Sequence, residues 1–134
     1  RHLQGRVIWT GYLEPPEVSA SFAAADICVL PYRDGASFRR GSFMAALAHG
    51  MPIVSTHPQV ALPELVHGEN VWLVPPHDPE ALSEALVRLA ADKPLRRRLG
   101  AGALALSEQF DWRLIAAHTL EVYDAVADPG GPGA

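Results

Sequence analysis

The sequence predicts an α/β fold, a Rossmann-like parallel sheet with flanking helices, on the strength of two observations. Short apolar runs alternate with segments of helical spacing along most of the 134 residues. These runs do not alternate with polar residues, which is typical of strands covered on both faces of a parallel sheet. Apolar residues make up 49% of the chain and charged residues 19%, which excludes an intrinsically disordered protein.

Four apolar runs are the predicted strands, and they span residues 7–10, 27–30, 52–55 and 71–74. Three of the runs are followed directly by a residue that interrupts strands, namely Gly11, Pro31 and Pro75. Because segments with helical spacing separate the runs, right-handed crossovers are expected to make the strands parallel. Ligands bind such sheets beyond the carboxyl ends of the strands, so three loops are of interest: residues 31–42, 56–63 and 75–78.

Proline, glycine and capping residues predict where the helices begin and end. Pro15 opens a first helix, and a second begins at Gly41 and ends at Gly50. A single helical turn is expected at residues 63–66. Three further helices are expected, each capped by an aspartate: Asp78, Asp92 and Asp111.

Apolar residues at helical spacing predict the buried face of each helix. The expected inward residues are Val18, Ser21, Phe22 and Ala25, then Phe43, Ala46 and Leu47, then Leu82, Ala85, Leu86 and Leu89, then Leu95, Leu99, Ala103 and Leu106, then Ile115, Thr119, Val122 and Val126. We interpret residues 1–127 as one domain that is incomplete at its N-terminus, followed by a flexible tail at residues 128–134.

Composition excludes several classes of function. A formal net charge of −4 argues against a nucleic-acid-binding protein. The single cysteine excludes an internal disulfide and a cysteine-based metal site, and no histidine cluster suggests a metal. No apolar run approaches the roughly 18 residues of a membrane span. We expect a cytoplasmic protein, with peripheral membrane association as an alternative for the full-length chain.

The loop at residues 31–42 carries the residues best suited to chemistry. Free amides at a helix start attract anions, and Gly41 would let a phosphate approach them. Ser42 can donate a hydrogen bond, and the guanidinium groups of Arg39 and Arg40 match phosphate oxygens. A diphosphate site and a surface loop with two solvated arginines are equally compatible with this pattern.

Other candidates have a weaker pattern. Glu64, with Glu69 and Asn70, could lie near a ribose, although such residues more often stabilise turns. His57 follows a strand end and is the best placed of the six histidines. The arginines at residues 96–98 are expected to form a solvated helix face. The three tryptophans are expected to be packing residues: Trp9, Trp72 and Trp112.

Five ordered segments resemble sequence blocks of the retaining glycosyltransferases of family 4, which have the GT-B fold. The segments are residues 7–13, 25–31, 46–56, 63–78 and 110–112. The resemblance implies an enzyme that transfers a sugar from a nucleotide diphosphate sugar to an acceptor with retention of configuration. It implies the nucleotide sugar as substrate and no separate cofactor.

One block departs from the family pattern. The family carries two glutamates, one near the donor sugar and one near the ribose, and these positions fall at Ser37 and Ala45. The loop instead resembles a variant form, Gly-x-Ser-x-Arg-Arg-Gly-Ser. That variant implies diphosphate contacts from Ser37, Arg39, Arg40, Gly41 and Ser42. The nucleotide or sugar is then expected near Asp34, Gly35, His57 and Glu64.

The resemblance also implies a larger protein. A GT-B enzyme has two Rossmann-like halves, and this chain begins near the third strand of the donor half. We therefore interpret it as a C-terminal, donor-side portion whose acceptor-binding domain is missing. Alone it is expected to bind nucleotide weakly and to catalyse no transfer. An exposed sheet edge, where missing strands would pair, would favour association of copies.

Two alternatives remain open. One is a non-catalytic Rossmann-like nucleotide-binding module with a decayed site, which the absent glutamates favour and the Arg-Arg-Gly-Ser sequence opposes. The other is a GT-B sugar-nucleotide epimerase. Titration with UDP, GDP and their sugars would separate a decayed module from an enzyme.

Overall fold

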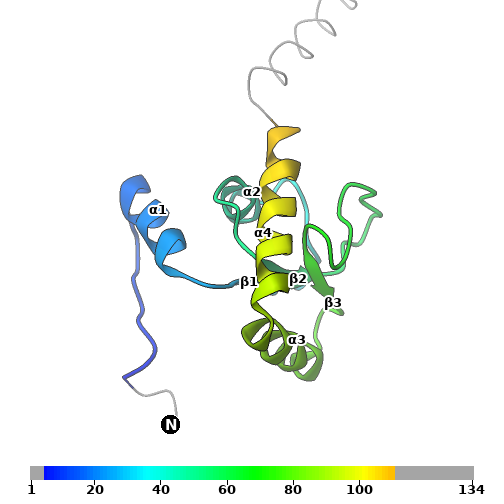
Figure 1. Ribbon diagram of the computed structural model, residues 1–134, viewed down its shortest axis with the longest axis horizontal. Coiled ribbons are helices and arrows are strands. Elements are labelled where there is room, and N and C mark those ends of the chain that lie inside the picture. Colours follow the sequence, from blue (N-terminus) through cyan, green and yellow to red (C-terminus); the bar gives the residue numbers. More distant parts are fainter. Residues whose placement is uncertain (1–4, 111–134) are drawn as a thin grey trace, which may run out of the picture.

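The computed structural model describes residues 5–110, which form a small parallel sheet with helices around it (Figure 1). The strands are β1 (Cys28–Leu30), β2 (Ile53–Thr56) and β3 (Trp72–Val74), in the order β1-β2-β3 and all parallel. The helices are α1 (Pro15–Ala24), α2 (Gly41–Ala48), α3 (Pro79–Ala91) and α4 (Lys93–Glu108). The predicted parallel α/β fold is confirmed.

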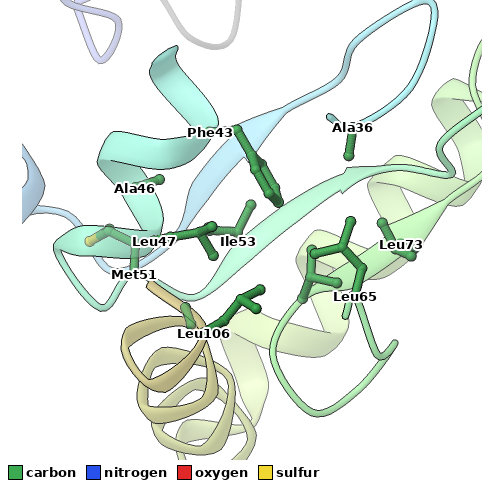
Figure 2. Close-up of a cluster of buried hydrophobic side chains, with 11 residues drawn as sticks. Ala36, Phe43, Ala46, Leu47, Met51, Ile53, Leu65, Leu73 and Leu106 are labelled. Carbon is green, nitrogen blue, oxygen red and sulfur yellow. The ribbon is translucent and has the colours of Figure 1, made fainter. Parts of the chain in front are cut away.

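The central strand β2 is buried along its whole length, and its side chains alternate between two apolar clusters. Ile53 joins a cluster built with α2 and the second half of α4, part of which is drawn in Figure 2. Val54 joins a second cluster with Leu89 of α3 and Leu99 of α4. The sheet is therefore covered on both faces, whereas the edge strand β1 is only half-buried.

The predicted aspartate caps are confirmed for α3 and α4. The Asp78 side chain accepts a hydrogen bond from the Ala81 amide at 2.9 Å, and Asp92 accepts one from the Leu95 amide at 3.0 Å. The predicted inward stripes of α2 and α4 are buried without exception: Phe43, Ala46, Leu47, Leu95, Leu99, Ala103 and Leu106. The expected helix after Asp111 and the tail at residues 128–134 lie outside the described residues.

The predicted strand at residues 7–10 is wrong. This segment has no strand partner among residues 5–110, and it extends away from the sheet (Figure 1). Apolar character favours a strand only where a neighbouring strand can receive its hydrogen bonds. Ile8 and Trp9 are consequently 84% and 92% exposed, so Trp9 is not a packing residue.

Helix α1 forms as predicted but buries none of its residues. It contacts α2 through His49, whose Nε2 lies 3.0 Å from the Ser19 hydroxyl and whose ring stacks on Phe22 at 4.7 Å. The edge of the sheet at β1 is unpaired within the described residues. Association of copies at this edge stays a prediction.

The arginines of α4 are not simply solvated, which corrects a second expectation. Arg96 donates hydrogen bonds to the carbonyls of Leu89 and Ala90, at 2.7 and 2.9 Å, and so satisfies the end of α3. Arg98 donates to the Gly68 carbonyl at 3.0 Å. A helical-wheel pattern cannot show carbonyls of other segments that lie within reach.

The segment at residues 63–66 is a hydrogen-bonded turn rather than a turn of helix. The Leu65 amide donates to the Leu62 carbonyl, but the Val66 amide donates to the Asn70 side chain at 2.9 Å, which ends the helical pattern. Asn70 also donates to the Glu64 carbonyl at 2.8 Å. The structural interpretation of Asn70 is therefore confirmed.

His67 fastens this turn to β3. Its Nδ1 accepts a hydrogen bond from the Leu73 amide at 3.0 Å, so the ring is held as the neutral Nε2–H tautomer. The ring stacks on Trp72 at 4.4 Å, with Arg88 on that indole as well. Desolvation and the positive charge of His57 lower the pKa of His67.

We predict that part of the acid sensitivity of the fold comes from His67. A lowered pKa in the folded chain means that the neutral form stabilises the fold above the ordinary value of 6.5 and that this stabilisation is lost as pH falls below it. His67→Asn keeps an acceptor but cannot titrate, so its free energy of unfolding should fall less than that of the wild type between about pH 7.5 and 5.5. Urea unfolding at both pH values measures this difference.

The control is His77→Asn, since His77 is exposed and makes no side-chain hydrogen bond within residues 5–110. Its pH dependence should equal that of the wild type. Equal slopes for His67→Asn and the wild type would show that this ring does not couple protonation to folding.

Candidate functional site

The carboxyl ends of the three strands carry two hollows, both formed by the loops that the sequence predicted. The larger has a volume of about 690 Å³ and lies between residues 34–40 and residues 58–62. Its lining includes Asp34, Gly35, Ser37, Arg39 and Arg40, five of the predicted site residues. We call this hollow the cleft.

Two buried hydroxyls at the end of β2 fix the loop that forms one wall of the cleft. Ser55 donates to the Leu30 carbonyl at 2.8 Å, and Thr56 donates to the Tyr32 carbonyl at 2.7 Å. The Thr56 carbonyl in turn accepts a hydrogen bond from the Ala36 amide at 3.0 Å. The loop after β1 is therefore held by the neighbouring strand before it reaches α2.

Gly35 sets how closely the two walls of the cleft approach. Its φ is +88°, a left-handed conformation that favours glycine. A Cβ atom at this position would lie 2.3 Å from the His57 carbonyl oxygen and 2.8 Å from the Cα of Pro58. Only glycine fits between the loop and the segment after β2.

The start of α2 has unused hydrogen-bond donors. Within residues 5–110, no hydrogen bond reaches the backbone amides of Gly41, Ser42 and Phe43, and the helix has no side-chain cap. A Cβ atom added at Gly41 would meet nothing within 4 Å, so the space beside these amides is open. These donors, with the positive end of the helix dipole, suit an anion.

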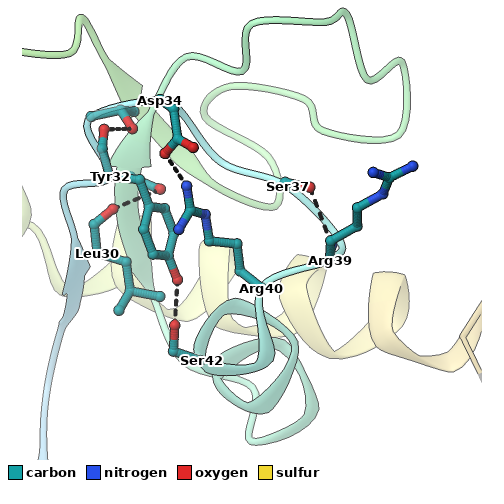
Figure 3. Close-up of polar contacts among 9 residues, drawn as sticks. Leu30, Tyr32, Asp34, Ser37, Arg39, Arg40 and Ser42 are labelled. Carbon is teal, nitrogen blue, oxygen red and sulfur yellow. Dashed lines mark hydrogen bonds and ion pairs between the residues drawn. The ribbon is translucent and has the colours of Figure 1, made fainter.

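The two predicted arginines behave differently, as Figure 3 shows. Arg40 forms an ion pair with Asp34, and its guanidinium lies 4.3 Å from the centre of the Tyr32 ring. The Arg39 side chain extends in the opposite direction and makes no ion pair within residues 5–110. One guanidinium is therefore held in place, and the other is free to follow a ligand.

Each predicted serine already has a local partner. The Ser37 hydroxyl accepts a hydrogen bond from the Arg39 amide at 3.1 Å, which leaves its proton available to a ligand. The Ser42 hydroxyl lies 2.5 Å from the Tyr32 hydroxyl. Gly41 and Ser42 stand at the start of α2 and are not among the residues that line the cleft.

The remaining predicted residues lie outside the cleft lining. The His57 side chain is exposed, and only its backbone borders the site, through the contact with Gly35. Glu64 is exposed in the turn, and its carbonyl accepts the bond from Asn70. The structure thus brings the predicted residues at 34–40 to the cleft and leaves these two side chains outside its lining.

The second hollow has a volume of about 390 Å³ and lies between the loops after β1 and β3. Arg33, His77 and Asp78 are among its lining residues. Asp78 already caps α3, and the sequence had not singled out the other two. Among the described residues, no cluster of three metal-ligating side chains is present and no helix could cross a membrane.

Tyr32 is the functional neighbour that the sequence did not reveal. It contacts Arg40 with its ring, Ser42 with its hydroxyl and Thr56 with its carbonyl. The available signal was an aromatic residue directly after a buried strand, where parallel sheets place their ligand loops. Cys28 lines neither hollow, and burial raises the pKa of its thiol.

Sequence comparisons identify relatives of this chain. The sequence model of the family described as glycosyl transferases group 1 matches residues 1–92. The phosphatidyl-myo-inositol mannosyltransferase of Mycobacterium leprae is 32% identical over 120 residues, which cover 90% of this chain and 32% of that protein. A D-inositol 3-phosphate glycosyltransferase of Streptomyces bingchenggensis is 34% identical over 111 residues, which cover 80% and 23%.

Solved structures agree with these relatives. Sucrose-phosphate synthase from Thermosynechococcus elongatus has a TM-score of 0.84 at 26% identity, covering 96% of this chain and 32% of that chain. Anabaena HepE, solved in complex with UDP, has a TM-score of 0.80 at 22% identity, covering 92% and 34%, and supports the fold alone. The chain spans 32% of the length of the mannosyltransferase. It belongs to the glycosyl transferases group 1 family and has part of the GT-B fold.

Proposed function

We propose that this chain is the donor-side part of an enzyme that transfers a sugar from a nucleotide diphosphate sugar to an acceptor, with retention of configuration. The diphosphate would lie at the start of α2, where Ser37, Arg39, Arg40, Gly41 and Ser42 hold it. Asp34, Gly35, His57 and Glu64 would lie around the nucleotide or sugar. The acceptor-binding domain would belong to the same, longer protein.

The observation that carries this proposal is that the amides of Gly41, Ser42 and Phe43, which have no partner within residues 5–110, directly follow two arginines that line the cleft. Amides at a helix start and arginine side chains each favour phosphate oxygens. Their combination is more specific than either feature alone.

The proposed chemistry is electrostatic. When the bond between the sugar and the diphosphate breaks, negative charge grows on the diphosphate that leaves. Arg39, Arg40 and the α2 amides would stabilise that charge without giving or taking a proton. In this mechanism the chain supplies leaving-group stabilisation, and the sugar forms its new bond to an acceptor molecule that the rest of the protein binds.

The expected location of the protein extends the same proposal. We expect the protein to be cytoplasmic, because its proposed donors are nucleotide sugars. Peripheral membrane association suits the relative whose name includes a phosphatidyl-inositol acceptor.

A binding module without catalysis is the second candidate, and one observation favours it. The positions of the two family glutamates hold Ser37 and Ala45, which carry no carboxylate. Sugar transfer by the full-length protein separates the candidates, since a decayed module would release no diphosphate from any nucleotide sugar. Epimerisation of the donor, measured in the same reaction, would support the epimerase alternative instead.

We predict that the two arginines contribute separately to nucleotide binding. In the full-length protein, Arg39→Ala and Arg40→Ala should each weaken UDP or GDP binding about tenfold, the size expected for a lost charged hydrogen bond. Isothermal titration calorimetry measures the affinities. Arg97→Ala is the matched control, since Arg97 is exposed on α4 and should change nothing. Equal affinities for all three variants would contradict the diphosphate assignment.

We predict that Gly41→Ala separates binding from folding. The added methyl group meets nothing in the free protein, so the thermal unfolding temperature should be unchanged or slightly raised. A diphosphate against the α2 amides would meet that methyl group, so the affinity for UDP or GDP should drop. Unchanged affinity would place the diphosphate away from the start of α2.

A further inference from the structure

Four side chains in the cleft region form one connected group. The Arg40 guanidinium lies against the Tyr32 ring and pairs with Asp34, while the Tyr32 hydroxyl reaches Ser42 (Figure 3). Asp34 and Arg40 both line the cleft. A carboxylate therefore stands inside a site whose proposed ligand is itself an anion.

Arg40 has two supports, and they do not depend on each other. Tyr32 holds the face of the guanidinium at 4.3 Å, and Asp34 binds one of its nitrogens at the edge. Tyr32 is itself fixed at both ends: Thr56 binds its carbonyl at 2.7 Å, and Ser42 lies 2.5 Å from its hydroxyl. The guanidinium can therefore keep its position on the Tyr32 ring when its ion pair with Asp34 breaks.

The ion pair between Asp34 and Arg40 is open to solvent. The Asp34 side chain is 61% exposed, against 33% for Arg40, and exposed ion pairs contribute little to stability. The carboxylate also occupies a guanidinium donor that a phosphate oxygen could use. A stronger, doubly charged ligand in the cleft would compete for that donor.

We propose that Asp34 is a built-in competitor of the diphosphate, a residue that sets donor affinity and product release through Arg40. This rests on the proposed function. On binding, Arg40 exchanges the Asp34 carboxylate for a phosphate oxygen while Tyr32 keeps the guanidinium in place. On release, Asp34 takes the guanidinium back and helps the nucleoside diphosphate to leave, a step that often limits turnover. Tyr32 is the positioning residue for this exchange.

The test measures affinities and dissociation rates of UDP, GDP and inorganic pyrophosphate on the full-length protein. Asp34→Asn should tighten binding of the diphosphate ligand about three- to fivefold and slow its dissociation, the size expected for an exposed ion pair. Glu84→Gln, which removes an exposed carboxylate on α3, is the matched control and should change neither. Asp34→Ser is a second variant should the amide disturb the loop.

A double-mutant cycle shows whether Asp34 acts through Arg40. In the Arg40→Ala background, Asp34→Asn should give no gain. A gain that persists there would mean that the carboxylate acts on the ligand by charge alone, and the exchange would be wrong. Tyr32→Leu should weaken binding more than Tyr32→Phe, which keeps the ring and loses only the contact with Ser42. Equal losses would remove the positioning role of the ring.

The outcomes also separate the two proposals. If Arg39→Ala weakens nucleotide binding while Asp34→Asn leaves it unchanged or weaker, the diphosphate site stands and the competitor role is wrong. If Asp34→Asn binds a diphosphate that the wild type barely binds, both proposals are supported. If neither the wild type nor Asp34→Asn binds UDP, GDP or pyrophosphate, both are overturned.

Discussion

Two hydroxyl groups at the carboxyl end of β2 hold the rest of the site in place. Ser55 and Thr56 are buried, and they bind the carbonyls of Leu30 and Tyr32 on the neighbouring segment. An apolar residue at either position would remove the side-chain hydrogen bond that ties this segment to β2, and each carbonyl would keep only a local donor, the Tyr32 or the Gly35 amide. The position of Tyr32, and through it that of Arg40, follows from a strand that never touches the cleft.

This arrangement would let a site that differs from the usual family pattern hold the proposed diphosphate. The loop lacks the two glutamates of the family and has Ser37 and Ala45 in their places. Its charged groups are instead Arg40, which pairs with Asp34, and Arg39, which makes no ion pair within residues 5–110. The charges of Asp34 and Arg40 cancel each other when no ligand is bound. Arg39 and the α2 amides still attract anions.

Much of the fold could be predicted because its signals are local. Aspartates that cap helices act on the amides three residues ahead, and the stripe of Phe43, Ala46 and Leu47 follows from helical spacing alone. The strand expected at residues 7–10 failed because pairing is not local: the segment has apolar residues but no partner within residues 5–110. The same reason accounts for the backbone contacts of Arg96 and Arg98, which depend on where other segments end.

The position of the candidate site in the fold could be predicted from the sequence, but the contacts of its side chains could not. A parallel sheet puts its ligand loops at one edge, and the Arg-Arg-Gly-Ser sequence marked which loop mattered. The ion pair between Asp34 and Arg40 spans six residues of irregular chain, where no periodic rule places side chains. His57 was expected in the cleft because it follows a strand, yet its side chain is exposed and only its carbonyl borders the site.

The close approach of Gly35 to the His57 carbonyl has a consequence for changing, by directed evolution, which ligand the cleft prefers. The width of the cleft depends on the absence of a single methyl group, at a residue that offers a ligand no side chain. Gln59 and Val60 on the opposite wall are exposed, and neither is among the nearest atoms that a Cβ at Gly35 would meet. A library that varies that wall and preserves the glycine should explore new specificities while the scaffold remains intact.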